Sequence, residues 1–221
     1  MVSKVPLIVF DMDGVLVKPR SSWRVIHDHF GVDNEESYEL YMRGMIDDME
    51  FMRRDISIWK GIDPGLSLRD IRTILSRTPR MGSLEASVNL LRDAGASTAI
   101  VSGGIDILAE ILNSGALFDH VIANGLDFDA RSLLSGEGIL RVPLRDKGVG
   151  LRKILDGGYF EPVVSLGDSH VDASMFSLSD LSVAFRPMDD IVSSAADAVV
   201  HGDDLLPAAE YISSWIRKWV N

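Results

Sequence analysis

The chain has 221 residues, of which 46% are hydrophobic and 25% are charged, as in an ordinary globular protein. This length suits one large domain or one domain with a small insert. The lack of cysteine excludes disulfides, thiolate metal sites and cysteine nucleophiles. Its 33 acidic and 22 basic residues give a formal net charge of −11, which disfavours nucleic acid as a partner but leaves a small anionic substrate open. The N-terminus lacks the order of a signal peptide and no apolar run could cross a bilayer, so we expect a cytoplasmic protein without a membrane partner, of open oligomeric state.

The first predicted element is a buried strand, because Val5–Phe10 is a continuous apolar run. It ends on Asp11 and Asp13, which are followed by Gly14. Residues 16 to about 79 contain no convincing strand and predict four helices, at roughly 22–30, 35–44, 47–60 and 67–77. We therefore predict a helical cap domain, 16–79, inserted after the first strand of a core domain made of 1–15 and 80–221.

Four methionines recur at steps of three and four residues on what we predict to be a single cap helix: Met42, Met45, Met49 and Met52. The amphipathic rule favours a place in the cap's own core. The alternative is a soft, adaptable wall that faces the substrate.

Four of the histidines have no spacing that suggests a site: His27, His29, His120 and His201.

After residue 80, short apolar runs alternate with stretches of helical spacing. This alternation predicts an α/β fold with a Rossmann-like parallel sheet that helices cover on both faces. We interpret 125–143 as a flap or hairpin. We expect the aromatic residues Tyr211, Trp215 and Trp219 of a last helix, 205–219, to pack in the core, and the alternative is an oligomer surface. The predicted strands are Ser97–Val101, His120–Ala123, Pro162–Leu166, Leu181–Phe185 and Ala198–Val200.

Polar residues follow several of these strands, at the edge where open parallel sheets bind their ligands. The strand 97–101 ends on Ser102, Gly103 and Gly104, and the strand 162–166 ends on Gly167 and Asp168, with Asp172 one turn later. Lys147 opens the helix before that strand. Carboxylates without soft ligands favour a hard divalent cation, most simply Mg²⁺, between Asp11 and Asp168.

This set of residue types suits phosphoryl transfer. A phosphate would bridge the metal, the Ser102 hydroxyl, free N–H groups of a Gly103-Gly104 turn at a helix N-terminus, and the Lys147 ammonium. One aspartate can attack phosphorus and form an acyl phosphate, while a second carboxyl protonates the leaving oxygen and later activates water. Positioning and charge stabilisation then do most of the catalysis.

The motifs "DMDGVL", "VSGG", "RDKG" and "GDSHVD", in this order, resemble the four motifs of the haloacid dehalogenase superfamily of phosphohydrolases. The early helical insert and the "SGG" resemble its phosphoserine-phosphatase-like branch. The resemblance implies a Mg²⁺-dependent hydrolase of a small phosphorylated metabolite that works through an aspartyl phosphate. It implies that Asp11 is the nucleophile and a metal ligand, and that Asp13 is the general acid and base and binds the metal through its carbonyl. Ser102 and the N–H of Gly103 would bind the phosphate, and Lys147 would neutralise its charge. Asp168 would be a metal ligand, and Asp172 would be oriented toward metal waters or Lys147.

Plainer roles are open for several of these residues. Lys147 could be a solvated surface lysine among its basic neighbours, and Asp172 could cap the helix that follows Gly167. Ser102 could cap a helix and bind phosphate at once. We expect His170, inside the last motif, to face solvent or substrate, because a Mg²⁺ site with oxygen ligands needs no imidazole.

The pattern departs from phosphoserine phosphatases where the substrate is recognised. In that family a glutamate soon after the first motif binds the substrate's amino group and a cap arginine binds its carboxylate, and these positions fall at or near Arg20 and Asp55 here, with reversed charges. Val171 stands where an asparagine is usual. We therefore expect a substrate other than phosphoserine. A phosphotransferase or mutase, a non-catalytic phosphate-binding protein and, more weakly, a dehalogenase are the alternatives.

Overall fold

The computed structural model describes residues 4–220 of the chain, and a seven-stranded sheet in the order β4-β3-β2-β1-β5-β6-β7 forms the centre of this part. Every pairing in it is parallel except that of β3 with β4. This confirms the predicted parallel sheet, with β1 at its middle. The strands are β1 (Val5–Phe10), β2 (Ser97–Ile105), β3 (His120–Phe128), β4 (Leu134–Ile139), β5 (Phe160–Gly167), β6 (Leu181–Phe185) and β7 (Ala198–Val200).

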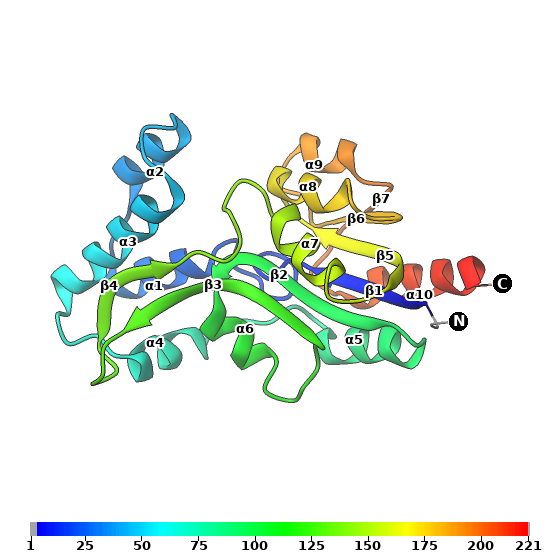
Figure 1. The fold of residues 1–221 in the computed structure, drawn as a ribbon, viewed down its shortest axis with the longest axis horizontal. Coiled ribbons are helices and arrows are strands. Elements are labelled where there is room, and N and C mark those ends of the chain that lie inside the picture. The colour runs from blue at the N-terminus through cyan, green and yellow to red at the C-terminus, as the bar shows by residue number, and fades with distance from the viewer. Residues whose placement is uncertain (1–3, 221) are drawn as a thin grey trace.

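Helices cover both faces of the sheet (Figure 1). Because successive side chains of a strand point to opposite faces, Ile8 and Phe10 join one apolar cluster while Leu7 and Val9 join another. The first cluster includes side chains of α5 (Leu84–Asp93), α6 (Asp106–Leu112) and α10 (Leu206–Val220), and the second those of α7 (Gly148–Leu155) and α8 (Ala173–Phe176). Burial on both faces explains why the β1 segment is apolar throughout.

Four helices separate β1 from α5, as predicted, and α2 and α3 lie at the end of the molecule away from α10 (Figure 1). Local signals set their ends: Gly31 closes the first helix at φ 65°, and Ser67 and Asp70 form a capping box on the fourth. The division into core and cap at residues 15/16 and 79/80 stays a prediction. The helices are α1 (Ser22–Phe30), α2 (Glu35–Met42), α3 (Asp48–Ile62) and α4 (Leu68–Leu75).

The prediction of one helix through all four methionines is wrong. Gly44 has φ 71° and separates α2 from α3, so Met42 and Met45 lie outside the helix that holds Met49 and Met52. Met52 is buried in the main core, whereas Met42 and Met45 are 51% and 67% exposed. The repeat of three and four residues is therefore not one helical stripe.

Residues 125–143 contain a hairpin, as predicted, because β4 pairs antiparallel with β3. The hairpin lies against α3: the Arg53 guanidinium donates to Glu137 at 3.0 Å and the Lys60 ammonium donates to the Leu134 carbonyl at 2.8 Å. At Gly138 a Cβ atom would lie 2.4 Å from Cε of Met52, so glycine allows the close approach of strand and helix. The core sheet thus supports the cap through this hairpin.

The aromatic residues of the last helix do not pack as predicted. Tyr211 and Trp219 are 43% and 47% exposed, and only Trp215 packs partly against the core. The buried face of α10 is instead Ala208, Ala209, Ile212 and Ile216, since a helix has room for one apolar stripe toward the sheet. None of the helices within residues 4–220 is long and apolar enough to cross a membrane.

Candidate active site

The carboxyl ends of β1 and β5 bring the predicted acids together. Asp11 and Asp168 are 2% and 3% exposed, and Asp172 is fully buried. The N–H of Asp11 donates to the Leu166 carbonyl at 2.9 Å, which continues the β1–β5 pairing to the start of the loop after β1. Gly14 has φ 80°, and a Cβ atom there would lie 2.0 Å from Oδ2 of Asp168. Glycine is therefore required where the loop after β1 turns past Asp168.

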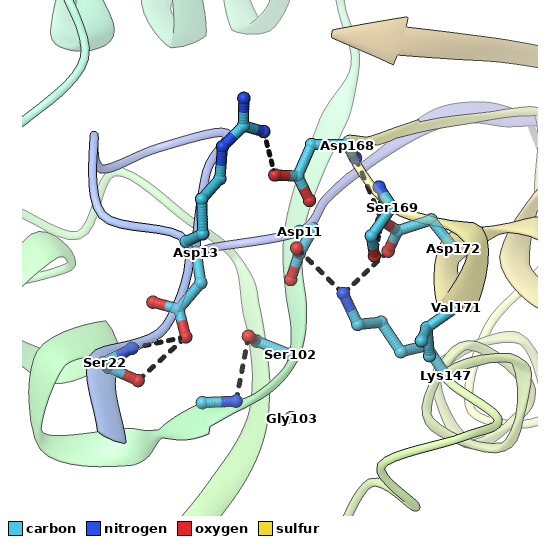
Figure 2. Close-up of polar contacts among 12 residues, drawn as sticks. Asp11, Asp13, Ser22, Ser102, Gly103, Lys147, Asp168, Ser169, Val171 and Asp172 are labelled. Atoms are coloured by element: carbon cyan, nitrogen blue, oxygen red, sulfur yellow. Dashed lines mark hydrogen bonds and ion pairs between the residues drawn. The ribbon is translucent and has the colours of Figure 1, made fainter. Parts of the chain in front are cut away.

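Lys147 lies between two of these carboxylates, just before α7 (Figure 2). Its Nζ is 2.8 Å from Oδ2 of Asp11 and 2.7 Å from Oδ1 of Asp172. The side chain is buried, so the structure contradicts the alternative of a solvated lysine. Burial lowers the pKa of Lys147, but attraction to Asp11 and Asp172 outweighs it and raises that pKa above its usual value. The ammonium therefore stays charged.

Both carboxylate oxygens of Asp172 are occupied. Oδ1 accepts from Lys147, and Oδ2 accepts from the N–H groups of Asp168 and Ser169 at 2.9 Å each and from the Ser169 hydroxyl at 3.0 Å. Ser169 and Asp172 form a reciprocal cap on a short 3₁₀ turn, so the capping role and the contact with Lys147 occur together. Asp172 thus positions the loop after β5 and the lysine.

Asp13 is held by Ser22, a residue that the sequence reasoning missed. Its Oδ2 accepts from both the N–H and the hydroxyl of Ser22, each at 2.9 Å (Figure 2). The same hydroxyl accepts from the Ile105 N–H at 2.9 Å. The other oxygen, Oδ1, is buried and has no hydrogen-bond partner among the described residues. Burial raises the pKa of Asp13, and the hydrogen bonds from Ser22 oppose this rise.

The Ser102 region differs from the prediction. The strand β2 continues to Ile105 with irregular pairing after Ser102, and α6 begins only at Asp106, so Gly103 and Gly104 are not a turn at a helix N-terminus. The Gly104 N–H is not free, because it donates to the Ser102 hydroxyl at 3.1 Å. A Cβ atom on Gly104 would lie 2.5 Å from both Oδ2 of Asp13 and the Ser22 hydroxyl. The two glycines thus let β2 pass close to the loop after β1.

The acids fit a hard divalent cation. One carboxylate oxygen from each of Asp11, Asp168 and Asp172 lies within 4.8 Å of the others, and Oδ1 of Asp11 is buried with no hydrogen-bond partner among the described residues. Burial raises the pKa of Asp11 well above its usual range, and burial and then Asp172 raise that of Asp168 to about 6. Arg20, which the sequence analysis placed at or near a substrate-recognition position and not beside the acids, forms an ion pair with Oδ2 of Asp168. Oxygen donors at these distances, with one oxygen unpartnered, suit Mg²⁺.

A cavity of about 610 Å³ joins this acidic cluster to the cap. Asp11, Asp13, Ser102, Gly103, Lys147 and Asp168 all line it, so the predicted site residues come together. Trp23, Met42, Phe51 and Met52 line its cap side. His170 lines it too, with a side chain that is 57% exposed. His27 and Asp55 are a buried polar pair in the same lining, and the spacing of the histidines did not suggest one.

A family model described as haloacid dehalogenase-like hydrolase matches residues 8–177. The chain belongs to the haloacid dehalogenase-like hydrolases. A phosphoserine phosphatase of Methanocaldococcus jannaschii is 29% identical over 96% of the chain and 100% of its own length. One of Archaeoglobus fulgidus is 27% identical over 93% of the chain and 59% of its own length. The solved structure of a substrate-bound phosphoserine phosphatase complex matches with a TM-score of 0.77 and 27% identity, over 95% of this chain and 99% of that one.

These similarities confirm the predicted family and branch: this hydrolase is a phosphatase that resembles the phosphoserine phosphatases in sequence and fold. The likeness covers the cap as well as the core, since the matches span nearly the whole chain. The substrate of this chain depends on the residues that line its own cavity, and the names of its relatives do not establish it.

Proposed function

We propose that this hydrolase cleaves small phosphomonoesters with Mg²⁺, through a phosphoryl group carried on Asp11. The observation that supports this most is the state of Asp11: one oxygen is held by Lys147 at 2.8 Å, while the other is buried, unpartnered among the described residues, and part of a residue that lines the cavity. Asp11, Asp168 and the Asp13 carbonyl would hold Mg²⁺. When bound, the ion supplies positive charge that offsets the phosphoryl oxygens.

The residues then divide the reaction into two steps. In the first, a carboxylate oxygen of Asp11 bonds to phosphorus as the ester P–O bond breaks, and Asp13 gives its proton to the leaving oxygen. In the second, Asp13 takes a proton from water, whose oxygen attacks phosphorus and releases Asp11 and inorganic phosphate. The Lys147 ammonium and the Ser102 hydroxyl hold the phosphoryl oxygens, and Ser22 orients Asp13 throughout.

We expect the substrate to differ from phosphoserine. The charged groups that would meet the organic part of a substrate are Arg20, which is paired with Asp168, and Asp55, which is buried at the cap end of the cavity. They lie at or near the positions at which the sequence shows charges opposite to those of phosphoserine phosphatases. Phosphoserine should therefore be turned over no faster than other small phosphate esters.

Hydrolysis of p-nitrophenyl phosphate tests the proposed reaction. We expect the purified protein to release p-nitrophenol with Mg²⁺ and to stop when EDTA removes the metal, and we expect Asp11→Asn to lose this activity while keeping its fold by circular dichroism. A wild-type protein that stays inactive across divalent metals would contradict the proposal. Transfer of the phosphoryl group to added alcohols in preference to water would favour a phosphotransferase instead.

A further inference from the structure

A buried polar group lies at the cap end of the cavity, away from the acids that we assign to chemistry. It consists of Asp55 on α3, His27 on α1 and Asn34 just before α2, and all three line the cavity. Asp55 and His27 are 2% and 1% exposed. The Asn34 amide donates to Oδ1 of Asp55 at 2.9 Å, and Nε2 of His27 lies 3.4 Å from Oδ2 of Asp55.

The hydrogen bond from Trp59 shows that the His27 ring is neutral. The Trp59 indole N–H donates to Nδ1 of His27 at 3.1 Å. Because an indole nitrogen can only donate, Nδ1 must accept, and the ring carries its one proton on Nε2. That Nε2 is buried and makes no hydrogen bond to any described residue. His27 therefore offers Asp55 no full positive charge.

Asp55 is thus a buried acid with neutral partners. Among the ion pairs of residues 4–220, Asp55 meets no lysine or arginine, and its one charged candidate, His27, is neutral by the argument above. Removing a carboxylate from water without a cation is unfavourable, so such a group in a substrate cavity calls for a positive charge from the ligand. The aromatic side chains of Trp23, Tyr38 and Phe51 line the same cavity.

The arginines that line the cavity are already engaged. Arg20 pairs with Asp168, Arg24 pairs with Asp28 at 2.7 Å, and the Arg145 guanidinium donates to the Tyr41 carbonyl and stacks 4.3 Å from the Tyr41 ring centre. Arg20 and Arg24 are thus paired with acids, whereas Arg145 meets no acid among the ion pairs of residues 4–220. The cavity suits a substrate with one phosphate and one cation, and the carboxylate ester in the experiment below tests whether Arg145 also accepts an anion.

We propose that Asp55 binds a primary ammonium group, so that the substrate is a phosphate ester of a small amino alcohol. The proposal rests on the proposed phosphatase function, and it names the substrate class of the same site. The ammonium would donate to Oδ2 of Asp55, which faces His27 rather than Asn34. The phosphate would lie at Asp11 and Lys147, at the other end of the cavity.

The direct experiment compares matched esters with Mg²⁺. O-phosphoethanolamine, 2-hydroxyethyl phosphate and phosphoglycolate present an ammonium, a hydroxyl and a carboxylate on a two-carbon chain. We expect kcat/KM to be about 10- to 100-fold higher for the ammonium ester than for the hydroxyl ester, which is what a hydrogen bond between charged groups contributes. Equal or faster turnover of the hydroxyl or carboxylate ester would overturn the proposal.

The variant Asp55→Asn separates recognition from a structural role. It should remove the preference for the ammonium ester by raising its KM, so that kcat/KM becomes similar for the ammonium and hydroxyl esters. The control Glu36→Gln removes the same charge from an exposed position of α2 and should leave the preference intact. An equal loss with every substrate would mean that Asp55 only holds the cap together, and would also overturn the proposal.

Calorimetry gives a readout that does not depend on turnover. O-phosphoethanolamine should bind the Asp11→Asn protein about tenfold or more tightly than it binds a protein that also carries Asp55→Asn. If wild-type protein does not hydrolyse p-nitrophenyl phosphate, the proposed reaction fails, yet this binding difference still tests the role of Asp55. If the reaction holds and the binding difference is absent, only the ammonium site fails.

Discussion

Ser22→Ala tests the connection between the cap and the acid that we assign to proton transfer. The Ser22 side chain is fully buried, and its hydroxyl makes two hydrogen bonds: it donates to Oδ2 of Asp13 and accepts from the Ile105 N–H, each at 2.9 Å. Alanine removes both, while the backbone N–H of residue 22 can still donate to Asp13. The substitution therefore deletes one oxygen atom from a site that otherwise keeps its contacts.

The magnitude follows from these two bonds. A hydrogen bond to a charged group contributes about 1.5–3 kcal/mol, and a buried N–H left without a partner costs about 1–3 kcal/mol. We therefore expect the free energy of unfolding to fall by about 4 kcal/mol, a large share of the total for a domain of this size. We expect kcat to fall about tenfold, since Asp13 loses one of its two orienting donors.

Urea unfolding and p-nitrophenyl phosphate hydrolysis measure the two effects, with Ser21→Ala as the matched control. The Ser21 hydroxyl only caps α1, accepting from the Arg24 N–H at 3.2 Å, so its loss should cost about 1 kcal/mol and leave kcat unchanged. If Ser22→Ala destabilised the protein no more than Ser21→Ala, or if it kept full activity, the reasoning about Asp13 would be refuted.

Two further predictions concern the same loops. Gly104→Ala should abolish most activity and lower the melting temperature, because its Cβ atom would lie 2.5 Å from both Asp13 and Ser22; a fully active variant would show that β2 can move away. In EDTA, Asp168 should make stability depend on pH: its pKa of about 6 lies above the 3.8 usual for aspartate, so its contribution is fully present below about pH 4 and is lost as pH rises through 6. The whole difference is about 3 kcal/mol, and about 2 kcal/mol of it falls between pH 4.5 and 7.5. Urea unfolding at these two pH values should show Asp168→Asn gaining about that much stability relative to wild type; parallel behaviour of the two proteins would contradict the shift.

Much of the fold could be predicted because its signals are local. The apolar runs of β1, β5 and β6 fall within a few residues of the observed strands, and the four cap helices follow caps, turns and periodicity within short windows. Parallel order then places the ends of β1, β2 and β5 at one edge, so Asp11, Ser102 and Asp168 had to come near one another. The methionine repeat led to a wrong prediction because Gly44, whose φ is positive, separates two helices, while the methionines on either side of it keep the spacing of a single helix.

The sequence by itself determined the family and the class of enzyme, a haloacid dehalogenase-like phosphatase, and its acids, serine and lysine at strand ends and helix starts predict a site for phosphate and a hard cation. Only the tertiary structure decided how these groups are held and what lies opposite them. Ser22 reaches Asp13, Arg20 reaches Asp168 across 148 positions of the chain, and Trp59 sets the protonation of His27 beside Asp55. Such pairs carry no periodic signal, because a contact between distant segments depends on how the cap packs over the sheet and not on spacing along the chain.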